Sequence, residues 1–203
     1  MTGVQPAESR ETRFTSPVIG IAASAGGLAA VSTLLGGLCP DLNAAIIVLQ
    51  HLSPEHPSQL AGILAARTRL KVSEAARQDQ LSKGSVLTAP PGLHLQVNPE
   101  GVISFSHRPA VNFVRPSADR LFESLARSFG SRAVAVILTG TGKDGAKGAQ
   151  VVKRAGGFVI VQDEATSEFF GMPGAAVRAG EVDRILPLEL IAAELHAYTG
   201  NLN

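Results

Sequence analysis

Three residue types required for acyl transfer to a serine are present in this chain as Ser24, His51 and Asp144. A serine hydroxyl attacks an ester carbonyl when an imidazole takes its proton and a carboxylate orients the imidazole. Glycines accompany the serine and the aspartate, in the runs A-S-A-G-G and T-G-T-G-K-D-G. The residue types therefore predict a nucleophile, a base and an orienting acid, provided that the fold brings them together.

Each of these three residues follows a short apolar run. The runs span residues 17–23, 44–49 and 133–138. Such runs are typical of strands that are buried on both faces of a parallel sheet. Ligands of an open parallel sheet bind beyond the carboxyl ends of its strands. We therefore expect the hydroxyl, the imidazole and the carboxylate to lie at one edge of one sheet.

The remainder of the chain alternates between strand and helix patterns. We expect further strands at 158–161 and 182–186, and helices from 26, from 57, near 117–128, at 146–155, after 173 and from 187. Three short strands at 85–89, 93–97 and 102–105, with turns rich in Pro and Gly, indicate antiparallel hairpins. The pattern predicts an α/β fold, doubly wound, with a mainly parallel sheet, helices on both faces and an antiparallel hairpin region in the middle of the chain.

Domain organisation follows from the same pattern. Residues 1–16 are polar and are expected to be a flexible leader, and residues 17–203 are expected to form a single catalytic domain.

Composition argues against several classes of protein. The formal net charge is +1, which gives no electrostatic reason to expect nucleic acid as a partner. Cys39 is the only cysteine, so an internal disulfide and a multi-cysteine metal site are excluded. We expect a cytoplasmic protein without metal or cofactor. No apolar run approaches the ~20 residues of a membrane-spanning helix, so membrane insertion is not expected.

Each candidate residue also has a purely structural interpretation. Ser24 and Asp144 each precede an expected helix and could be its N-cap, and His51 could be an ordinary loop residue. Their joint placement favours catalysis, because three unrelated structural residues have no reason to supply these three types at one edge. Asp119 and Asp163 stay open as alternative orienting carboxylates.

Ester hydrolysis also needs hydrogen-bond donors for the carbonyl oxygen, which becomes negative during the reaction. The glycines could allow backbone N–H groups to take this role. Gly26 and Gly27 allow a helix to begin close to a substrate, with its N–H groups aimed at the site. We expect the backbone N–H groups of Ala25 and Thr141 to be the oxyanion donors. The glycine spacing matches neither the dinucleotide fingerprint nor the P-loop.

Six motifs, in this order, resemble the catalytic domain of the chemotaxis protein-glutamate methylesterases, the CheB family. They are G-I-A-A-S-A-G-G from residue 20, Q-H-L-S-P from 50, A-P-P-G from 89, R-P-S-A-D from 115, L-T-G-T-G-K-D-G from 138 and G-M-P from 171. The resemblance implies hydrolysis of glutamyl γ-methyl esters on receptor helices, and deamidation of glutamines, through an acyl-enzyme. It places the family's nucleophile, base and acid on Ser24, His51 and Asp144. It also implies a methylated chemoreceptor or receptor-like protein as partner, with a methyltransferase or regulator in trans.

The chain departs from the family pattern at a few points. Ala22 and Ala25 replace a usual glycine and a frequent threonine, and Lys143 adds a cation beside the acid. Residues 1–16 are too few for the receiver domain that the chemotaxis enzymes usually carry, so we expect a domain without a receiver, closer to the type fused to methyltransferases. Two other functions stay open: a non-catalytic module that docks on a receptor or kinase, and a small-molecule carboxylesterase.

Overall fold

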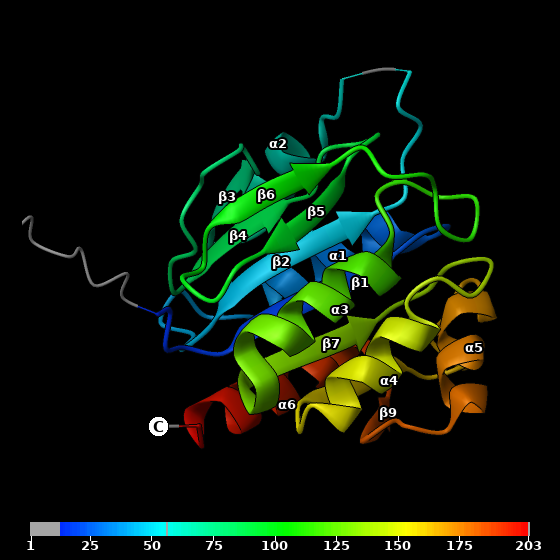
Figure 1. Ribbon diagram of the computed structural model, residues 1–203. Coiled ribbons are helices and arrows are strands. Elements are labelled where there is room, and N and C mark those ends of the chain that lie inside the picture. Colours follow the sequence, from blue (N-terminus) through cyan, green and yellow to red (C-terminus); the bar gives the residue numbers. More distant parts are fainter. Residues whose placement is uncertain (1–12, 56, 203) are drawn as a thin grey trace, which may run out of the picture.

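A seven-stranded parallel sheet forms the centre of the computed structural model, which describes residues 13–55 and 57–202 (Figure 1). The strand order is β3-β4-β2-β1-β7-β8-β9, and each neighbouring pair is parallel. The strands are β1 (Val18–Ala23), β2 (Ala45–Gln50), β3 (Lys71–Glu74), β4 (Ser85–Thr88), β7 (Ala133–Ile137), β8 (Phe158–Gln162) and β9 (Arg184–Leu186). A separate antiparallel hairpin pairs β5 (His94–Val97) with β6 (Ile103–Ser106).

Helices cover both faces of the sheet, which confirms the predicted doubly wound α/β architecture. The helices are α1 (Gly27–Gly36), α2 (Leu60–Ala65), α3 (Ala118–Phe129), α4 (Ala146–Arg154), α5 (Gly171–Ala179) and α6 (Leu188–Gly200), with a 3-10 turn at Gly130–Arg132. In Figure 1, α3 and α4 lie in front of the sheet, and α1 and α6 lie behind it. No helix in the described ranges is long and apolar enough to cross a membrane.

The central strand β1 supplies both cores, because alternate side chains of a strand point to opposite faces. Val18 and Ala22 belong to the cluster on the α3 side, while Ile19 and Ile21 belong to the cluster on the α1 side. The chain moves outward from β1 through β2 and later returns to place β7 on the other side of β1. This reversal of direction between β1 and β7 is the position at which open α/β sheets bind ligands.

The middle of the chain differs from the prediction in one respect. The strand expected at 85–89 is β4, and it is part of the parallel sheet rather than of an antiparallel hairpin. Val86 is fully buried, as in the other interior strands. The neighbouring strand β3 was not predicted, because its largely exposed sequence K-V-S-E at the edge of the sheet contains no apolar run. Only β5 and β6 form the expected hairpin.

Two helix starts also differ from the prediction. The helix expected from Pro57 begins at Leu60, whose N–H donates to the Oγ of Ser58 in a turn before the helix. The helix α5 begins at Gly171, before Pro173, which therefore lies in the first turn. Proline is tolerated there because its missing N–H has no partner within the helix.

The described part of the expected leader is attached to the domain. Residues 1–12 lie outside the described residues. The N–H of Phe14 donates to the carbonyl of Pro99 (3.1 Å), and its ring meets that of Phe129 edge-on at 6.3 Å. Arg132 donates to the carbonyl of Phe14 (2.6 Å), and Ser16 is buried. These packed residues correct the expectation of a flexible leader that extends to residue 16.

Candidate active site

Ser24 and His51 occupy adjacent positions at the carboxyl ends of β1 and β2. Ala23 and Gln50 are paired in register, and the N–H of His51 donates to the carbonyl of Ala23 (3.0 Å). The N–H of Ser24 donates to the carbonyl of Thr139 (3.0 Å), which binds the serine to the end of β7 as well. The sheet therefore places the predicted nucleophile beside the predicted base.

Ser24 is not the N-cap of the following helix. That position belongs to Gly26, which has φ 74°, and no side chain caps the helix. Glycine adopts this left-handed conformation without strain, so the chain can turn from β1 into α1 directly after Ser24. A Cβ at Gly27 would come within 2.2 Å of the Oε1 of Gln50, so the second glycine allows the helix to pack closely on β2. The N-cap interpretation of Ser24 is wrong.

The Nε2 of His51 lies 3.0 Å from the Oδ2 of Asp144. Their side chains are 11% and 3% exposed, so this contact is almost shielded from water. Among the described residues no hydrogen bond joins the Oγ of Ser24 to His51. Hydrogen bonds between nucleophile and base often form only when substrate binds. Because Nε2 is held by the carboxylate, Nδ1 is the ring nitrogen that remains for Ser24.

Asp144 caps a helix, although not the one that follows it. Its own helix α4 has Gly145 as N-cap. The carboxylate instead accepts the hydroxyl of Ser117 (2.7 Å) and the N–H of Ala118 (2.6 Å), at the start of α3. A longer bond comes from the N–H of Asp119 (3.3 Å). A helix N-terminus favours a negative charge, so α3 stabilises the ionised acid.

The pKa of Asp144 lies below its ordinary value of 3.8. Burial is the largest influence and raises this pKa, but the hydrogen bonds from His51, Ser117 and Ala118 together outweigh it. Asp144 is consequently an anion at neutral pH. An anion at this position accepts the Nε2–H of His51 and favours the neutral tautomer in which Nδ1 carries no proton.

Asp119 is a second buried carboxylate beside Asp144, with a different set of partners. Burial raises its pKa above the ordinary 3.8, and the charge of Asp144 adds to the effect. It accepts the N–H groups of Gly145 (3.0 Å) and Gly148 (2.8 Å), and the amide of Asn112 (3.0 Å). These bonds hold the start of α4, so Asp119 positions the loop that carries Asp144. Among the described residues, His51 does not hydrogen-bond to Asp119.

Asp163, the other alternative carboxylate, closes a local turn. It accepts both the N–H (3.0 Å) and the hydroxyl (2.7 Å) of Thr166, three residues further on. Of the three carboxylates considered from the sequence, only Asp144 bonds to His51.

The loop after β7 lies against the serine turn. The hydroxyl of Thr139 donates to the carbonyl of Ala25 (3.0 Å) and accepts the N–H of Phe169 (2.9 Å). The N–H groups of Ala25 and Thr141 donate to no other group in the described part of the chain. Both expected oxyanion donors are therefore unengaged in this structure.

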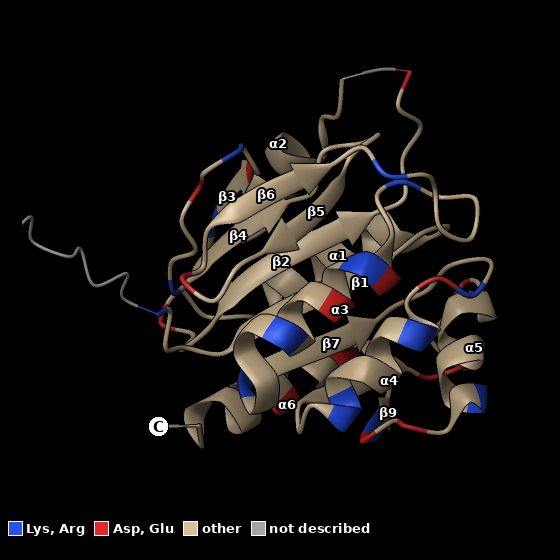
Figure 2. Cartoon of the chain, in the orientation of Figure 1, with Lys and Arg blue, Asp and Glu red and all other residues tan. Residues whose placement is uncertain are grey.

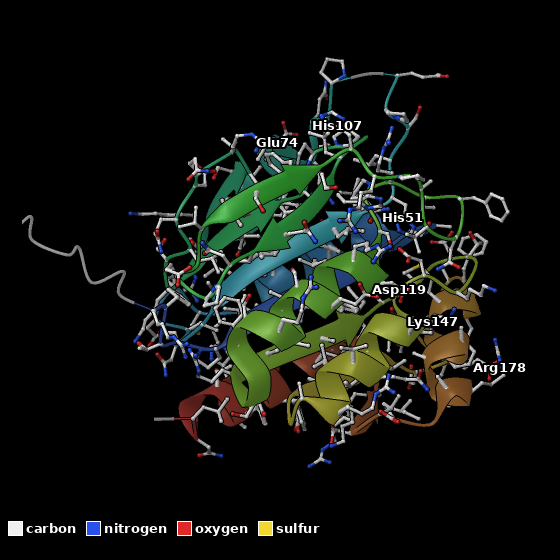
Figure 3. The ribbon with its side chains drawn as sticks, in the orientation of Figure 1. His51, Glu74, His107, Asp119, Lys147 and Arg178 are labelled. Carbon is white, nitrogen blue, oxygen red and sulfur yellow. The ribbon has the colours of Figure 1, made fainter. Side chains whose placement is uncertain are left out.

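Two pockets open beside these residues. The first, of about 430 Å³, is lined by His51 together with apolar side chains from the 52–54 and 110–114 loops. The second, of about 280 Å³, is lined by Asp119 and three cations: Lys143, Lys147 and Arg178. In Figure 3, His51, Asp119, Lys147 and Arg178 follow one another down the right-hand side of the view. Within the described residues, no group of three or more His, Cys, Asp or Glu side chains could hold a metal ion.

The arrangement can be compared with known proteins. A family model described as CheB methylesterase matches residues 19–195 of this chain. The chain belongs to the CheB methylesterase family. The match covers every strand end described above.

Solved and curated members of the CheB methylesterase family agree with this assignment. The crystal structure of the Thermotoga maritima CheB methylesterase catalytic domain superposes with a TM-score of 0.87 at 34% identity, over 91% of this chain and 100% of that one. A protein-glutamate methylesterase/protein-glutamine glutaminase of Anaeromyxobacter dehalogenans is 47% identical over 94% of this chain. The protein-glutamate methylesterase FrzG of Myxococcus xanthus is 42% identical over 88%. The chain spans 58% and 54% of the lengths of these two relatives.

Several residues of this CheB methylesterase domain were not singled out from the sequence as part of the site. The amide of Gln50 donates to the carbonyl of Ser24 (2.6 Å) and so fixes the serine turn. Ser117 and Asn112 donate to the carboxylate of Asp144. A polar residue at the end of a buried strand could have indicated Gln50, and the motif R-P-S-A-D contains Ser117. The role of Asn112 depends on a long loop and had no sequence signal.

Proposed function

We propose that this domain is a serine hydrolase that removes methyl groups from glutamyl γ-methyl esters. In this proposal Ser24 is the nucleophile, His51 the base and Asp144 the orienting acid. The backbone N–H groups of Ala25 and Thr141 stabilise the oxyanion.

The observation that carries the proposal is the 3.0 Å contact between Nε2 of His51 and Oδ2 of Asp144, beside Ser24 at the next strand end. A buried, ionised carboxylate fixes the orientation and tautomer of an imidazole, and its charge stabilises the imidazolium formed during reaction. Binding alone does not require a buried carboxylate bonded to a histidine beside a serine hydroxyl. The geometry therefore favours catalysis over binding alone.

The first half of the reaction forms an acyl-enzyme. Nδ1 of His51 takes the proton of Ser24 as the Oγ attacks the γ-carbonyl carbon, and the carbonyl oxygen becomes negative between the two N–H donors. The imidazolium then gives its proton to the methoxy oxygen. The C–O bond breaks, methanol leaves, and the glutamyl group remains as an ester of Ser24.

Water completes the cycle along the same route. His51 takes a proton from a water molecule, whose oxygen attacks the acyl-enzyme, and returns a proton to Oγ as Ser24 leaves. The products are a glutamate side chain and the free serine. A glutamine substrate follows the same steps and releases ammonia in place of methanol, which accounts for the deamidation in the proposal.

The substrate and setting belong to the proposal as well. The names of the relatives support a glutamyl ester in a protein substrate, and FrzG supports a chemosensory system. We infer a methylated chemoreceptor or receptor-like protein as partner, a methyltransferase or regulator acting in trans, and a cytoplasmic location. The active unit is a single domain that includes residues 17–203.

Methanol release from a protein bearing glutamyl γ-methyl esters tests the proposal. The wild-type protein should release methanol, and Ser24→Ala should not. Ser32→Ala, which changes a partly buried serine on α1, is the matched control and should retain activity. Hydrolysis of simple esters without release of methanol from the protein would support a small-molecule carboxylesterase instead. Absence of both activities would support a docking module.

A further inference from the structure

A two-residue turn at Asn112 and Phe113 has an unusual sequence for its shape. Val111 and Val114 exchange two backbone hydrogen bonds of 3.1 and 3.0 Å across it. Asn112 has φ 51° and Phe113 has φ 67°. Positive φ at both central residues is the type I′ hairpin turn, which favours Asn first and Gly second. Phenylalanine at the second position is strained.

Phe113 is fully exposed, so burial of its ring does not offset this strain. The residue is 102% exposed relative to a reference residue, the highest exposure among the large apolar residues described. Strained residues persist where the surrounding structure fixes them, and they gather at functional sites. An exposed aromatic ring at such a position therefore indicates a contact with another molecule.

The turn is tied directly to the proposed catalytic acid. The amide of Asn112 donates to the Oδ2 of Asp119 (3.0 Å) and, at 3.4 Å, to the Oδ1 of Asp144. On the other side of the turn, Arg115 donates to the carbonyls of His107 and Arg108, at 3.2 and 3.3 Å. Phe113 is consequently held at a fixed place relative to the catalytic acid.

Phe113 also shares a pocket with the proposed base. His51 and Phe113 line the pocket of about 430 Å³, and Leu52, which is 38% exposed, adds to its apolar wall. A molecule that brings an ester to Ser24 and His51 thus approaches beside this ring.

The charges around the pocket indicate what kind of molecule fits. Arg115 lines the pocket itself. Beyond Asn112, the neighbouring pocket is lined by three cations, Lys143, Lys147 and Arg178, and by the buried carboxylate of Asp119. Figure 2 shows basic residues on both α4 and α5. These cations complement an acidic polypeptide, such as one that carries glutamyl side chains near the reacting ester.

We propose that Phe113 is the docking residue for the acidic polypeptide segment that carries the glutamyl ester, and that an apolar side chain of that segment packs on its ring beside the His51 pocket. The inference rests on the proposed function and adds to it a determinant of substrate choice. Phe113 contributes to binding of the protein substrate and takes no part in the chemistry.

Steady-state kinetics of Phe113→Ala and Phe113→Gly test this inference. Each variant should raise the KM for a methyl-esterified protein substrate about tenfold, as loss of an aromatic interface anchor does, with kcat little changed. Turnover of p-nitrophenyl acetate should fall much less than that of the protein substrate, because this small ester carries no polypeptide segment that could pack on the ring. Leu190→Ala on α6, where the leucine is 53% exposed, is the control and should change neither activity.

Thermal unfolding adds an independent readout. Phe113→Gly relieves the left-handed strain and should unfold at the same or a higher temperature than wild type while it binds substrate more weakly. A protein-substrate KM unchanged in both variants, while wild type is active, would overturn the docking role and leave the proposed function intact. An equal loss on p-nitrophenyl acetate would overturn it too, because the ring would then shape the catalytic site. Absence of both wild-type activities would instead refute the proposed function.

Discussion

Gly140 and Ser24 are packed so closely that a Cβ at position 140 would lie 2.8 Å from the Cβ of Ser24. The same atom would lie 2.5 Å from the sulfur of Met172 at the start of α5. The missing side chain thus allows the loop after β7, which carries the acid, to close on the serine turn. The proposed nucleophile is thus packed against the loop that follows β7, more than 100 residues further along the chain.

Replacing this glycine should therefore affect the site and the fold together. Gly140→Ala should lower the free energy of unfolding by about 1–3 kcal/mol, as overpacking of a close contact does. Methanol release should fall at least about tenfold, since ångström-scale misplacement of a nucleophile has effects of this size or larger. Urea unfolding and initial rates measure the two quantities.

Gly62→Ala is the control for that substitution. No heavy atom lies within 4 Å of a Cβ at this position in α2. The variant should be more stable by about 0.5–1 kcal/mol, because alanine is the better helix former, with activity unchanged. If Gly140→Ala, like Gly62→Ala, lowered neither the stability nor the rate of methanol release, the close packing of Gly140 on Ser24 would not be needed for fold or activity.

The two buried carboxylates should differ in their effect on activity. Asp144→Asn should lower kcat by about 10⁴, the loss found when the acid of a triad becomes an amide, with KM little changed. Asp119→Asn should stay within about tenfold of wild type, because Asp119 holds Gly145 and Gly148 and not the histidine. The opposite ranking of these two variants would assign the orienting role to Asp119.

Stability should depend on pH in a way that separates the same two residues. The pKa of Asp144 is depressed in the folded state, so its ionisation stabilises the fold. This contribution to the free energy of unfolding is fully present above the ordinary pKa of 3.8 and is lost as pH falls through the lower pKa of the folded state. The pKa of Asp119 is raised in the folded state, so its protonated form stabilises the fold. This contribution to the free energy of unfolding is fully present below pH 3.8 and is lost as pH rises through the higher pKa of the folded state. In urea unfolding at a series of pH values, the stability difference between wild type and Asp144→Asn should shrink below 3.8. A difference that is constant through this range would contradict the depressed pKa.

The hydroxyl of Ser117 should contribute to the ionisation of the acid. Ser117→Ala removes a 2.7 Å bond to the carboxylate, which should raise the pKa of Asp144 and cost about 1.5–3 kcal/mol of stability. Ser128→Ala on the same helix loses a bond to the neutral carbonyl of Val97 and should cost only about 0.5–1.5 kcal/mol. Equal costs in urea unfolding would show that the charge of Asp144 adds nothing to its bond with Ser117.

Residues of a catalytic unit should show strongly non-additive losses. Ser24→Ala and His51→Ala should each remove nearly all turnover, and the double variant should lose little more than either. Initial rates of methanol release give the comparison. Losses that multiply in the double variant would mean that the two residues act independently.

The sequence was sufficient to predict the strand ends. Buried parallel strands appear as continuous apolar runs, so the runs before Ser24, before His51 and before the loop of Asp144 identified the sheet and the edge at which the proposed site lies. The resemblance to the CheB family was confirmed by the family match and by the T. maritima structure.

Features that depend on tertiary contacts could not be read in the same way. The polar edge strand β3 has no apolar run, and the parallel position of β4 is set by its neighbours on both sides. Asp144 caps α3 rather than its own helix, which requires two loops to meet. The exposed ring of Phe113 is visible only once the turn around it is known.

Labelling with a fluorophosphonate tests the central claim most directly, because this reagent reacts with a serine activated by a neighbouring base. The mass of the intact wild-type protein should increase by one adduct, and peptide mapping should place it on Ser24. Ser24→Ala should take up no label, His51→Ala should react far more slowly, and Ser32→Ala should react like wild type. An unmodified wild-type protein, or an adduct that persists in Ser24→Ala, would contradict the assignment of Ser24 as the nucleophile.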